Sequence, residues 1–228
     1  MKTATPKYFT FALTLLLVAF GASSAMADSF TITTPSTNMP LGGGGPYATV
    51  TINVTSSTTA DVTFASHDNG TYIYLMGAVN AVDLNVNAAT FTVSSPIIGT
   101  SSLAGHTAGT LTNDGFQNAV DGFGSFNLSI GNSDGFGQAD TNVSFTLTNT
   151  SGTWTDAFSV LKSNSNNFDV AIHGFQCADT CNQSTSSAIS TGFAGGDWPA
   201  PTTVPEPGSI MLLGTGLTGL GTLLRRRQ

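Results

Sequence analysis

The sequence predicts an all-β fold, an antiparallel β-sandwich of a jelly-roll-like kind. Apolar and polar residues alternate along nearly every apolar segment, which is the pattern of a strand with one buried face. Valine and threonine are abundant, and their branched side chains favour strands over helices. The segments are separated by Gly, Asn, Asp and Ser, which favour turns. About ten short strands joined by such turns indicate two packed antiparallel sheets.

The first strands are expected between residues 47 and 76. Residues 47–55 alternate throughout, and residues 60–64 repeat the pattern. A turn signal follows at residues 68–70, and residues 72–76 form the next apolar segment. This order predicts a hairpin in which residues 60–64 pair with residues 72–76.

The rest of the chain follows the same rule. Further strands are expected at residues 82–86, 91–93, 126–130, 143–147 and 168–172. Only one short helical turn is expected, at residues 157–162. The glycine-rich residues 39–46 should form a loop, and the polar residues 185–203 a stalk. The sandwich is therefore expected to span residues 28–184 as one domain.

The N-terminal residues have the three parts of a secretory signal peptide. Two lysines precede an apolar run at residues 9–22, and small residues ending at Ala27 form a cleavage site. We expect the Sec machinery to export the chain and signal peptidase to remove residues 1–27, so that Asp28 begins the mature protein.

The last 25 residues, 204–228, contain a rigid Pro-Glu-Pro motif, an uncharged apolar run and a basic end. These parts are Pro205, Glu206 and Pro207, then residues 209–224, then Arg225, Arg226 and Arg227. As a helix, the apolar run would be about 24 Å long. Long arginine side chains can reach the headgroups and so extend it across a bilayer core of about 30 Å. We therefore predict a single transmembrane helix at 209–224, with the arginines on the cytoplasmic side as a stop.

This order of motif, apolar helix and basic terminus resembles the PEP-CTERM sorting signal of Gram-negative bacteria. The resemblance implies that an exosortase-type membrane protease recognises Pro205, Glu206 and Pro207 and cleaves close by. It also implies an association with exopolysaccharide and biofilm. The protein would lie in the inner membrane before processing, and at the cell surface or outside the cell afterwards.

The charge distribution excludes nucleic acid as a partner. Between Asp28 and Thr203 there are 12 Asp residues against the single basic residue Lys162, which gives a net charge of −11. Such a surface repels nucleic acid and anionic lipid. Its polar groups come mainly from Thr, Ser, Asn and Gly, whose neutral groups hydrogen-bond well with sugars and water.

Two motifs that resemble catalytic or cofactor sites lie in the wrong context. Residues 131–135 match the G-x-S-x-G pattern around Ser133, but poor helix formers follow the serine, and the hydrolase elbow needs a helix there. Residues 214–219 match a dinucleotide fingerprint, but they lie inside the apolar tail. We expect no catalytic residue and no enzyme activity, with a secreted hydrolase as the remaining alternative.

The two cysteines, Cys177 and Cys181, predict a disulfide bond. They are an even number in a chain that is expected to be exported to an oxidising compartment. His173 lies four residues before Cys177, so metal binding by these three residues is one alternative, and free thiols are another.

No cofactor is expected, with calcium as the alternative. Oxygen-bearing loops occur at residues 68–69, 113–114 and 132–140, but none fits the EF-hand pattern. A sugar-stacking platform is a second alternative, and its aromatic residues would be Tyr72, Tyr74, Trp154 and Trp198.

These observations predict an exported, non-enzymatic surface or extracellular-matrix protein that is sorted through its C-terminal signal. The alternative is a carbohydrate-binding module at the cell surface. The hydrolase reading comes last because no segment can build the strand–turn–helix that it needs.

Overall fold

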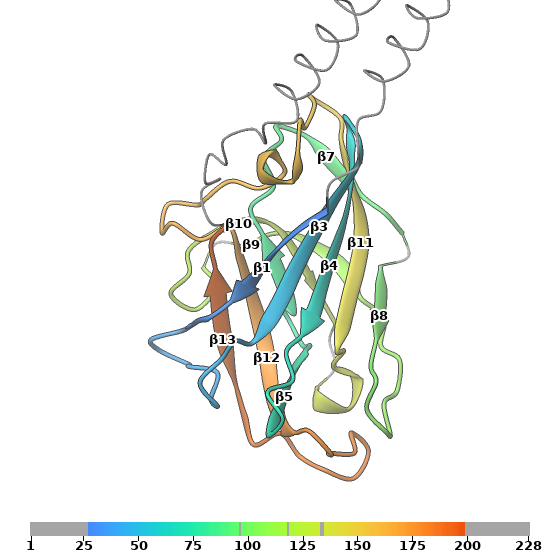
Figure 1. Cartoon of the computed structure of the whole chain (residues 1–228), viewed down its shortest axis with the longest axis vertical. Coiled ribbons are helices and arrows are strands. Elements are labelled where there is room, and N and C mark those ends of the chain that lie inside the picture. Colours follow the sequence, from blue (N-terminus) through green and yellow to red (C-terminus); the bar gives the residue numbers. More distant parts are fainter. Residues whose placement is uncertain (1–26, 96, 118, 133–134, 199–228) are drawn as a thin grey trace, which may run out of the picture. The chain divides into compact units, whose positions relative to one another are not determined.

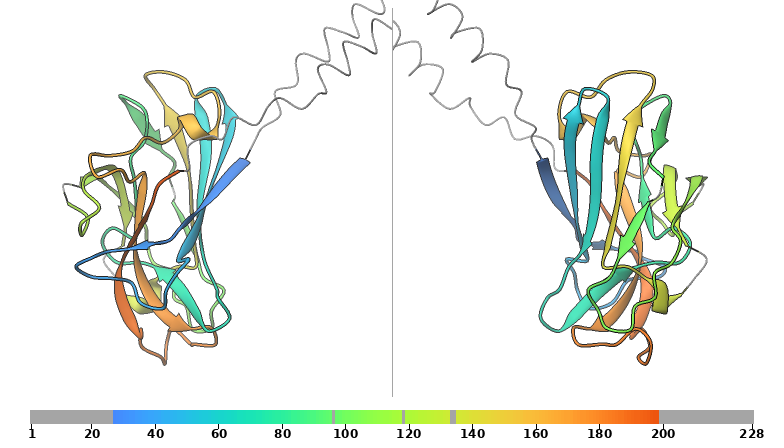
Figure 2. Two further views of the ribbon diagram at one scale, coloured as in Figure 1. Left: turned by 60° about the vertical axis from the view of Figure 1, so that its left-hand side comes forward. Right: turned by 90° about the vertical axis from the view of Figure 1, so that its right-hand side faces the viewer.

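Two antiparallel sheets make up the part of the chain that the computed structural model describes, residues 27–95, 97–117, 119–132 and 135–198 (Figure 1). The sheets lie face to face, as the edge-on views of Figure 2 show. The prediction of an all-β fold with two antiparallel sheets is confirmed. The predicted signal peptide (apart from Ala27) and the predicted transmembrane helix lie outside the described residues. Within the described ranges, no helix is long and apolar enough to cross a membrane.

The first sheet, sheet A, has six strands, and β11 pairs with both β7 and β8 at one edge. In spatial order they are β1 (Ala27–Ile32), β3 (Ala48–Ser56), β4 (Thr59–Ser66), β11 (Asn142–Asn149) and β7 (Phe91–Val93), and β8 (Ile98–Thr100) lies outside this order as a second partner of β11. Alternation sends every second residue of β3, β4 and β11 into the core, and the residues between them face outward.

The second sheet, sheet B, has seven strands, and β5 pairs with β12 outside the main order. The strands are β2 (Thr34–Pro35), β13 (Ser190–Gly196), β12 (Val170–Ala178), β6 (Val82–Leu84), β10 (Phe126–Gly131), β9 (Thr112–Gln117) and β5 (Tyr72–Met76). Two short 3₁₀ helices complete the elements, η1 (Phe136–Gln138) and η2 (Ala157–Ser159). The predicted helical turn at 157–162 is therefore shorter than expected.

The predicted hairpin between residues 60–64 and 72–76 is wrong. β4 pairs with β3 and β11 in sheet A, whereas β5 pairs with β12 in sheet B. The turn at 68–70 does form, with Asn69 N–H donating to the Tyr72 carbonyl at 3.1 Å, but it carries the chain from one sheet to the other. Alternation predicts a strand but not its partner, because both sheets bury one face of each strand in the same core.

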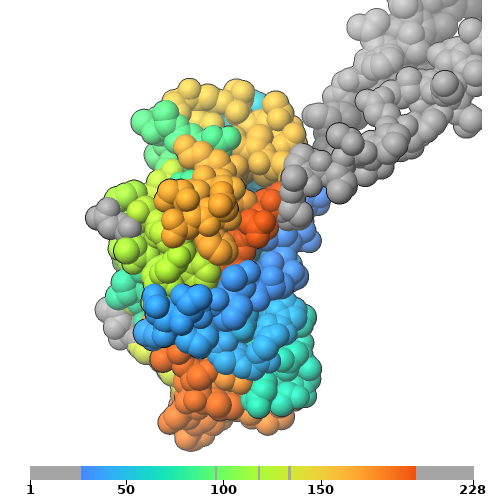
Figure 3. Space-filling model, turned by 90° about the vertical axis from the view of Figure 1, so that its left-hand side faces the viewer, coloured from blue at the N-terminus to red at the C-terminus, as the bar shows by residue number. Residues whose placement is uncertain are grey.

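The predicted stalk is also wrong over its described part. Ser190–Gly196 forms β13, which pairs with β12 from Gln176 to Val170. Its glycines serve close packing: a Cβ on Gly192 would lie 2.5 Å from the Met39 carbonyl oxygen. In Figure 3 the blue segment that contains β2 lies against the orange segment of β12 and β13. The sandwich therefore continues past residue 184, and residues 199–203 lie outside the described residues.

The main core lies between the two sheets. It contains the inward residues of both, with Val50, Val62 and Phe64 from sheet A, and Leu84 and Ile172 from sheet B. The expected loop at 39–46 has little regular structure but places Leu41 in this core, where it is 1% exposed. The sheets thus bury a continuous apolar layer between them. The outward face of sheet A carries polar side chains, whereas sheet B carries two smaller apolar clusters outside the main core.

Candidate functional site

The predicted sorting residues lie outside the described residues. This applies to Pro205, Glu206, Pro207, Arg225, Arg226 and Arg227. Ala27 and Asp28, which flank the predicted signal cleavage, are the first two residues of β1 and pair with Asn53 and Ile52. Cleavage between them would remove only the first pair of this strand, and the cleavage itself stays a prediction.

The predicted disulfide is confirmed. Cys177 on β12 is bonded to Cys181, and their Cα atoms lie 6.1 Å apart across a tight turn. Cys177 is buried and packs with Ile73, Leu75 and Ala139 in a small cluster of its own. The bridge therefore ties the end of β12 to the turn that follows it.

The metal alternative for these cysteines is wrong, because both sulfur atoms are in the disulfide and His173 has other partners. Its Nδ1 lies 3.1 Å from the Val79 carbonyl oxygen and its Nε2 lies 3.0 Å from the Thr191 hydroxyl. The ring stacks on Phe193, and burial lowers the pKa of the imidazole. Across the described ranges, no three His, Cys, Asp or Glu side chains form a metal-binding group.

The residues around the G-x-S-x-G motif do not build a hydrolase elbow. Ser133 lies outside the described residues, but the segment after it forms only the three-residue η1. Asp140, a later acidic residue, is 1% exposed and lies against His106, whose Nε2 is 3.1 Å from Asp140 Oδ1. The turn residues around His106 predict a solvated side chain, and this prediction is wrong, because the side chain is 13% exposed and lies against Asp140, 34 residues further along the chain.

The proposed sugar-stacking platform is wrong. Tyr74 is 0% exposed, and Trp154 is 2% exposed with its indole N–H donating to the Asn87 carbonyl at 3.0 Å. Trp198 is half-buried against Phe30. Tyr74 and Trp154 belong to the main core, and Tyr72 and Trp198 pack against it, so these rings are used for packing rather than for stacking on a sugar.

The outward face of sheet A carries rows of short polar side chains. One row runs from Ser29 on β1 through Thr51 and Thr63 to Ser144 on β11. The next row contains Asn53, Asp61 and Thr146. Neighbouring strands in a sheet lie about 4.8 Å apart, so these groups form a regular array. It carries little charge: Asp61 is the single ionisable side chain of the two rows.

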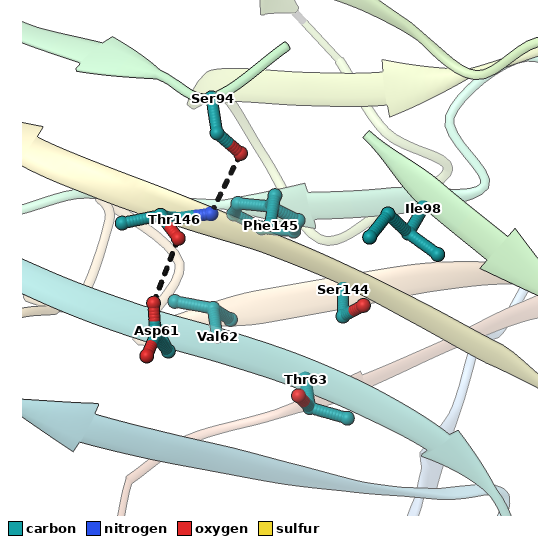
Figure 4. A pocket seen from close by; sticks show the side chains of 8 residues that line it. All are labelled: Asp61, Val62, Thr63, Ser94, Ile98, Ser144, Phe145 and Thr146. Atoms are coloured by element: carbon teal, nitrogen blue, oxygen red, sulfur yellow. Dashed lines mark hydrogen bonds between the residues drawn. The ribbon is translucent and has the colours of Figure 1, made fainter. Parts of the chain in front are cut away.

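A shallow groove of about 170 Å³ lies on this face beside β8 (Figure 4). Thr146 donates its hydroxyl to Asp61 Oδ1 at 2.7 Å, and its backbone N–H to Ser94 Oγ at 2.9 Å. Ser144 and the half-exposed Ile98 line the other end. The groove thus offers hydroxyls, one carboxylate and a small apolar contact.

A larger hollow of about 480 Å³ shares Ser94 with this groove. Its lining is neutral, and consists of Val93, Ser94, Ser95, Ile97, Gly109, Thr110, Leu111, Thr112 and Asn113. Neutral donors and acceptors beside short apolar groups suit a hydroxylated, uncharged ligand rather than an ionic one.

The C-terminal tail matches a known protein-sorting motif. A family model, the PEP-CTERM protein-sorting motif, matches residues 203–227. The chain carries a PEP-CTERM protein-sorting motif. The resemblance predicted from Pro205, Glu206 and Pro207 is therefore confirmed, and the motif implies an exported protein that is sorted by its C-terminal signal and processed by exosortase-type membrane machinery.

The PEP-CTERM motif covers only the C-terminal tail and says nothing about the activity of the sandwich. Comparisons with curated proteins and with solved structures find no match.

Proposed function

We propose that this protein is an exported, non-enzymatic surface or extracellular-matrix protein that associates with exopolysaccharide. The observation that carries the proposal is a sorting motif attached to a β-sandwich with a hydroxyl-rich outward face. The sorting motif directs the protein to the cell surface or beyond. The polar rows of sheet A then offer neutral hydrogen-bonding groups of the kind that polysaccharide hydroxyls pair with.

The non-enzymatic part of the proposal is supported by how the histidines are used. His173 holds a carbonyl and a hydroxyl with its two ring nitrogens, and its pKa is lowered by burial. His106 lies against the buried carboxylate of Asp140. Neither histidine lines the groove or the hollow beside sheet A. These surfaces therefore offer no histidine that could act as the general base beside a nucleophile.

Two changes to the tail test the sorting step. Deleting residues 209–228 removes the predicted membrane anchor, so the sandwich should be released as a soluble protein. Replacing Pro205, Glu206 and Pro207 by alanine keeps the anchor but should block recognition, so uncleaved protein should accumulate in the inner membrane. Immunoblots of membrane and medium fractions distinguish the two. Wild-type processing of the alanine variant would contradict the proposal.

A carbohydrate-binding module is the second candidate, and the groove beside Asp61 favours it. The exported protein should then bind neutral glycans in a glycan array, and Asp61→Ala should weaken the binding. Asp179→Ala is the matched control, because Asp179 is exposed and has no part in the groove. Equal binding by the two variants would rule out this groove as the glycan site.

A further inference from the structure

Sheet B contains a buried carboxylate without a hydrogen-bond donor. Asp83 lies at the middle of β6, between Val82 and Leu84, whose side chains belong to the core between the sheets. The side chain of Asp83 therefore lies on the opposite face of the sheet, and it is 0% exposed. Neither carboxylate oxygen has a clear hydrogen-bond partner. Lys162, the one Lys or Arg within the described ranges, is exposed and forms no ion pair there.

The pairing of β10 with β6 and β9 brings a second carboxylate, that of Asp114, near Asp83. Ser129 on β10 is the partner of Asp83 on one side and of Gly115 on the other, next to Asp114. A Cβ on Gly131 would lie 3.0 Å from Asp114 Oδ2, 2.9 Å from the Ala78 carbonyl oxygen and 3.0 Å from the Asn80 backbone nitrogen. The missing side chain of Gly131 therefore leaves a position on which a carboxylate oxygen and a carbonyl oxygen converge.

Two further oxygen atoms complete the cluster. The Ser129 hydroxyl donates a hydrogen bond to Asn80 Oδ1 at 3.1 Å. Burial raises the pKa of Asp83 well above its usual value, Ser129 partly offsets this, and the charge of Asp114 raises it further. The one hydroxyl proton of Ser129 cannot serve Asn80 and Asp83 together. The Thr112 hydroxyl serves Asp114, and the Asn132 N–H serves the Ala78 carbonyl. The two buried oxygens of Asp83 are left without a partner, which is the situation that a bound cation resolves.

We propose that Asp83, Asp114, Asn80, Ser129 and the carbonyl oxygen of Ala78 form a Ca²⁺ site on the outward face of sheet B. All five donors are oxygen atoms, the ligands that calcium prefers, and the two carboxylates balance its charge. His173 does not take part, because both of its ring nitrogens have partners. With only two carboxylates, the affinity should fall in the range of extracellular calcium modules, with a Kd of about 0.1–1 mM.

The test measures calcium binding by the purified full chain. After treatment with EDTA, thermal unfolding and isothermal titration calorimetry are followed with CaCl₂ up to about 10 mM, well above the expected Kd. Calcium should raise the melting temperature by several degrees, because it binds only the folded chain. A melting temperature that does not change with CaCl₂ would overturn the proposal, and an equal response to MgCl₂ would overturn the assignment to calcium.

Two variants locate the site. Asp83→Asn keeps the size of the side chain, and should lose at least about tenfold in calcium affinity. Asp114 is exposed, so the Asp114→Asn variant should fold normally, and it should show the same loss of calcium affinity. Asp179→Asn, at an exposed position outside the cluster, is the matched control and should bind calcium like the wild type. Unchanged affinity in both the Asp83 and Asp114 variants would place any calcium elsewhere and refute this site.

Discussion

Replacing Asp140 by asparagine should remove a pH dependence of stability that one buried acid creates. The Asp140 backbone is held by two hydrogen bonds with Met76, at 2.7 and 2.8 Å, and its carboxylate is 1% exposed. His106 Nε2 lies 3.1 Å from Oδ1, and no hydrogen bond to either carboxylate oxygen is formed by the described residues. The carboxylate packs over Gly99, where a Cβ would collide with it. The site excludes water, and the contact with His106 replaces its hydrogen bonds only in part.

Burial raises the pKa of Asp140 from 3.8 to about 6, and the contact with His106 offsets part of the rise. Because the folded protein binds this proton more tightly than the unfolded chain, the resulting stabilisation is complete below pH 3.8. It is lost as the pH rises through about 6. One pKa unit corresponds to about 1.4 kcal/mol, so the full effect is about 3 kcal/mol, of which about 2 kcal/mol falls between pH 8 and pH 4.

Urea unfolding of the wild type and of Asp140→Asn at pH 8 and pH 4 measures this. Burial also raises the pKa of Asp83 and Asp169, so the difference between the two proteins is the informative quantity. The wild type should gain about 2 kcal/mol more than the variant on going from pH 8 to pH 4. Asp61→Asn, at an exposed position, should behave like the wild type. If the Asp140 variant shows the wild-type pH dependence, the argument from burial fails.

Three further predictions follow from the chain ends and the core. N-terminal sequencing of the exported protein should begin at Asp28, and an intact Met1 would exclude the signal peptide. Replacing both Cys177 and Cys181 by serine should lower the free energy of unfolding by about 2 kcal/mol, measured by urea unfolding, and a cost near zero would show that the bridge adds no stability. Leu41→Ala should cost about 2–5 kcal/mol in the same assay because Leu41 is buried, and a cost below about 1 kcal/mol would show that this loop is not part of the core.

Local patterns in the sequence were enough for much of the fold and for the sorting route. The alternation in residues 47–55 and 143–147 reports on one strand at a time, and a strand that buries one face needs only that pattern. The tail likewise carries its own signal in consecutive residues, and the family match at 203–227 agrees with it. Cys177 and Cys181 are four residues apart, so their pairing was also a local question.

Only the tertiary structure decided which strands pair and which polar groups meet. Residues 72–76 could pair with either neighbour in sequence, and the register with β12 settles their sheet. The composition of β13 is that of a linker, but its Gly192 is needed where the loop at 39–41 passes over it. Asp83 and Asp114 come from strands that are separated in sequence and joined through β10. Such contacts depend on packing between residues that are far apart in the sequence. Alternation and composition are local properties and do not predict that packing.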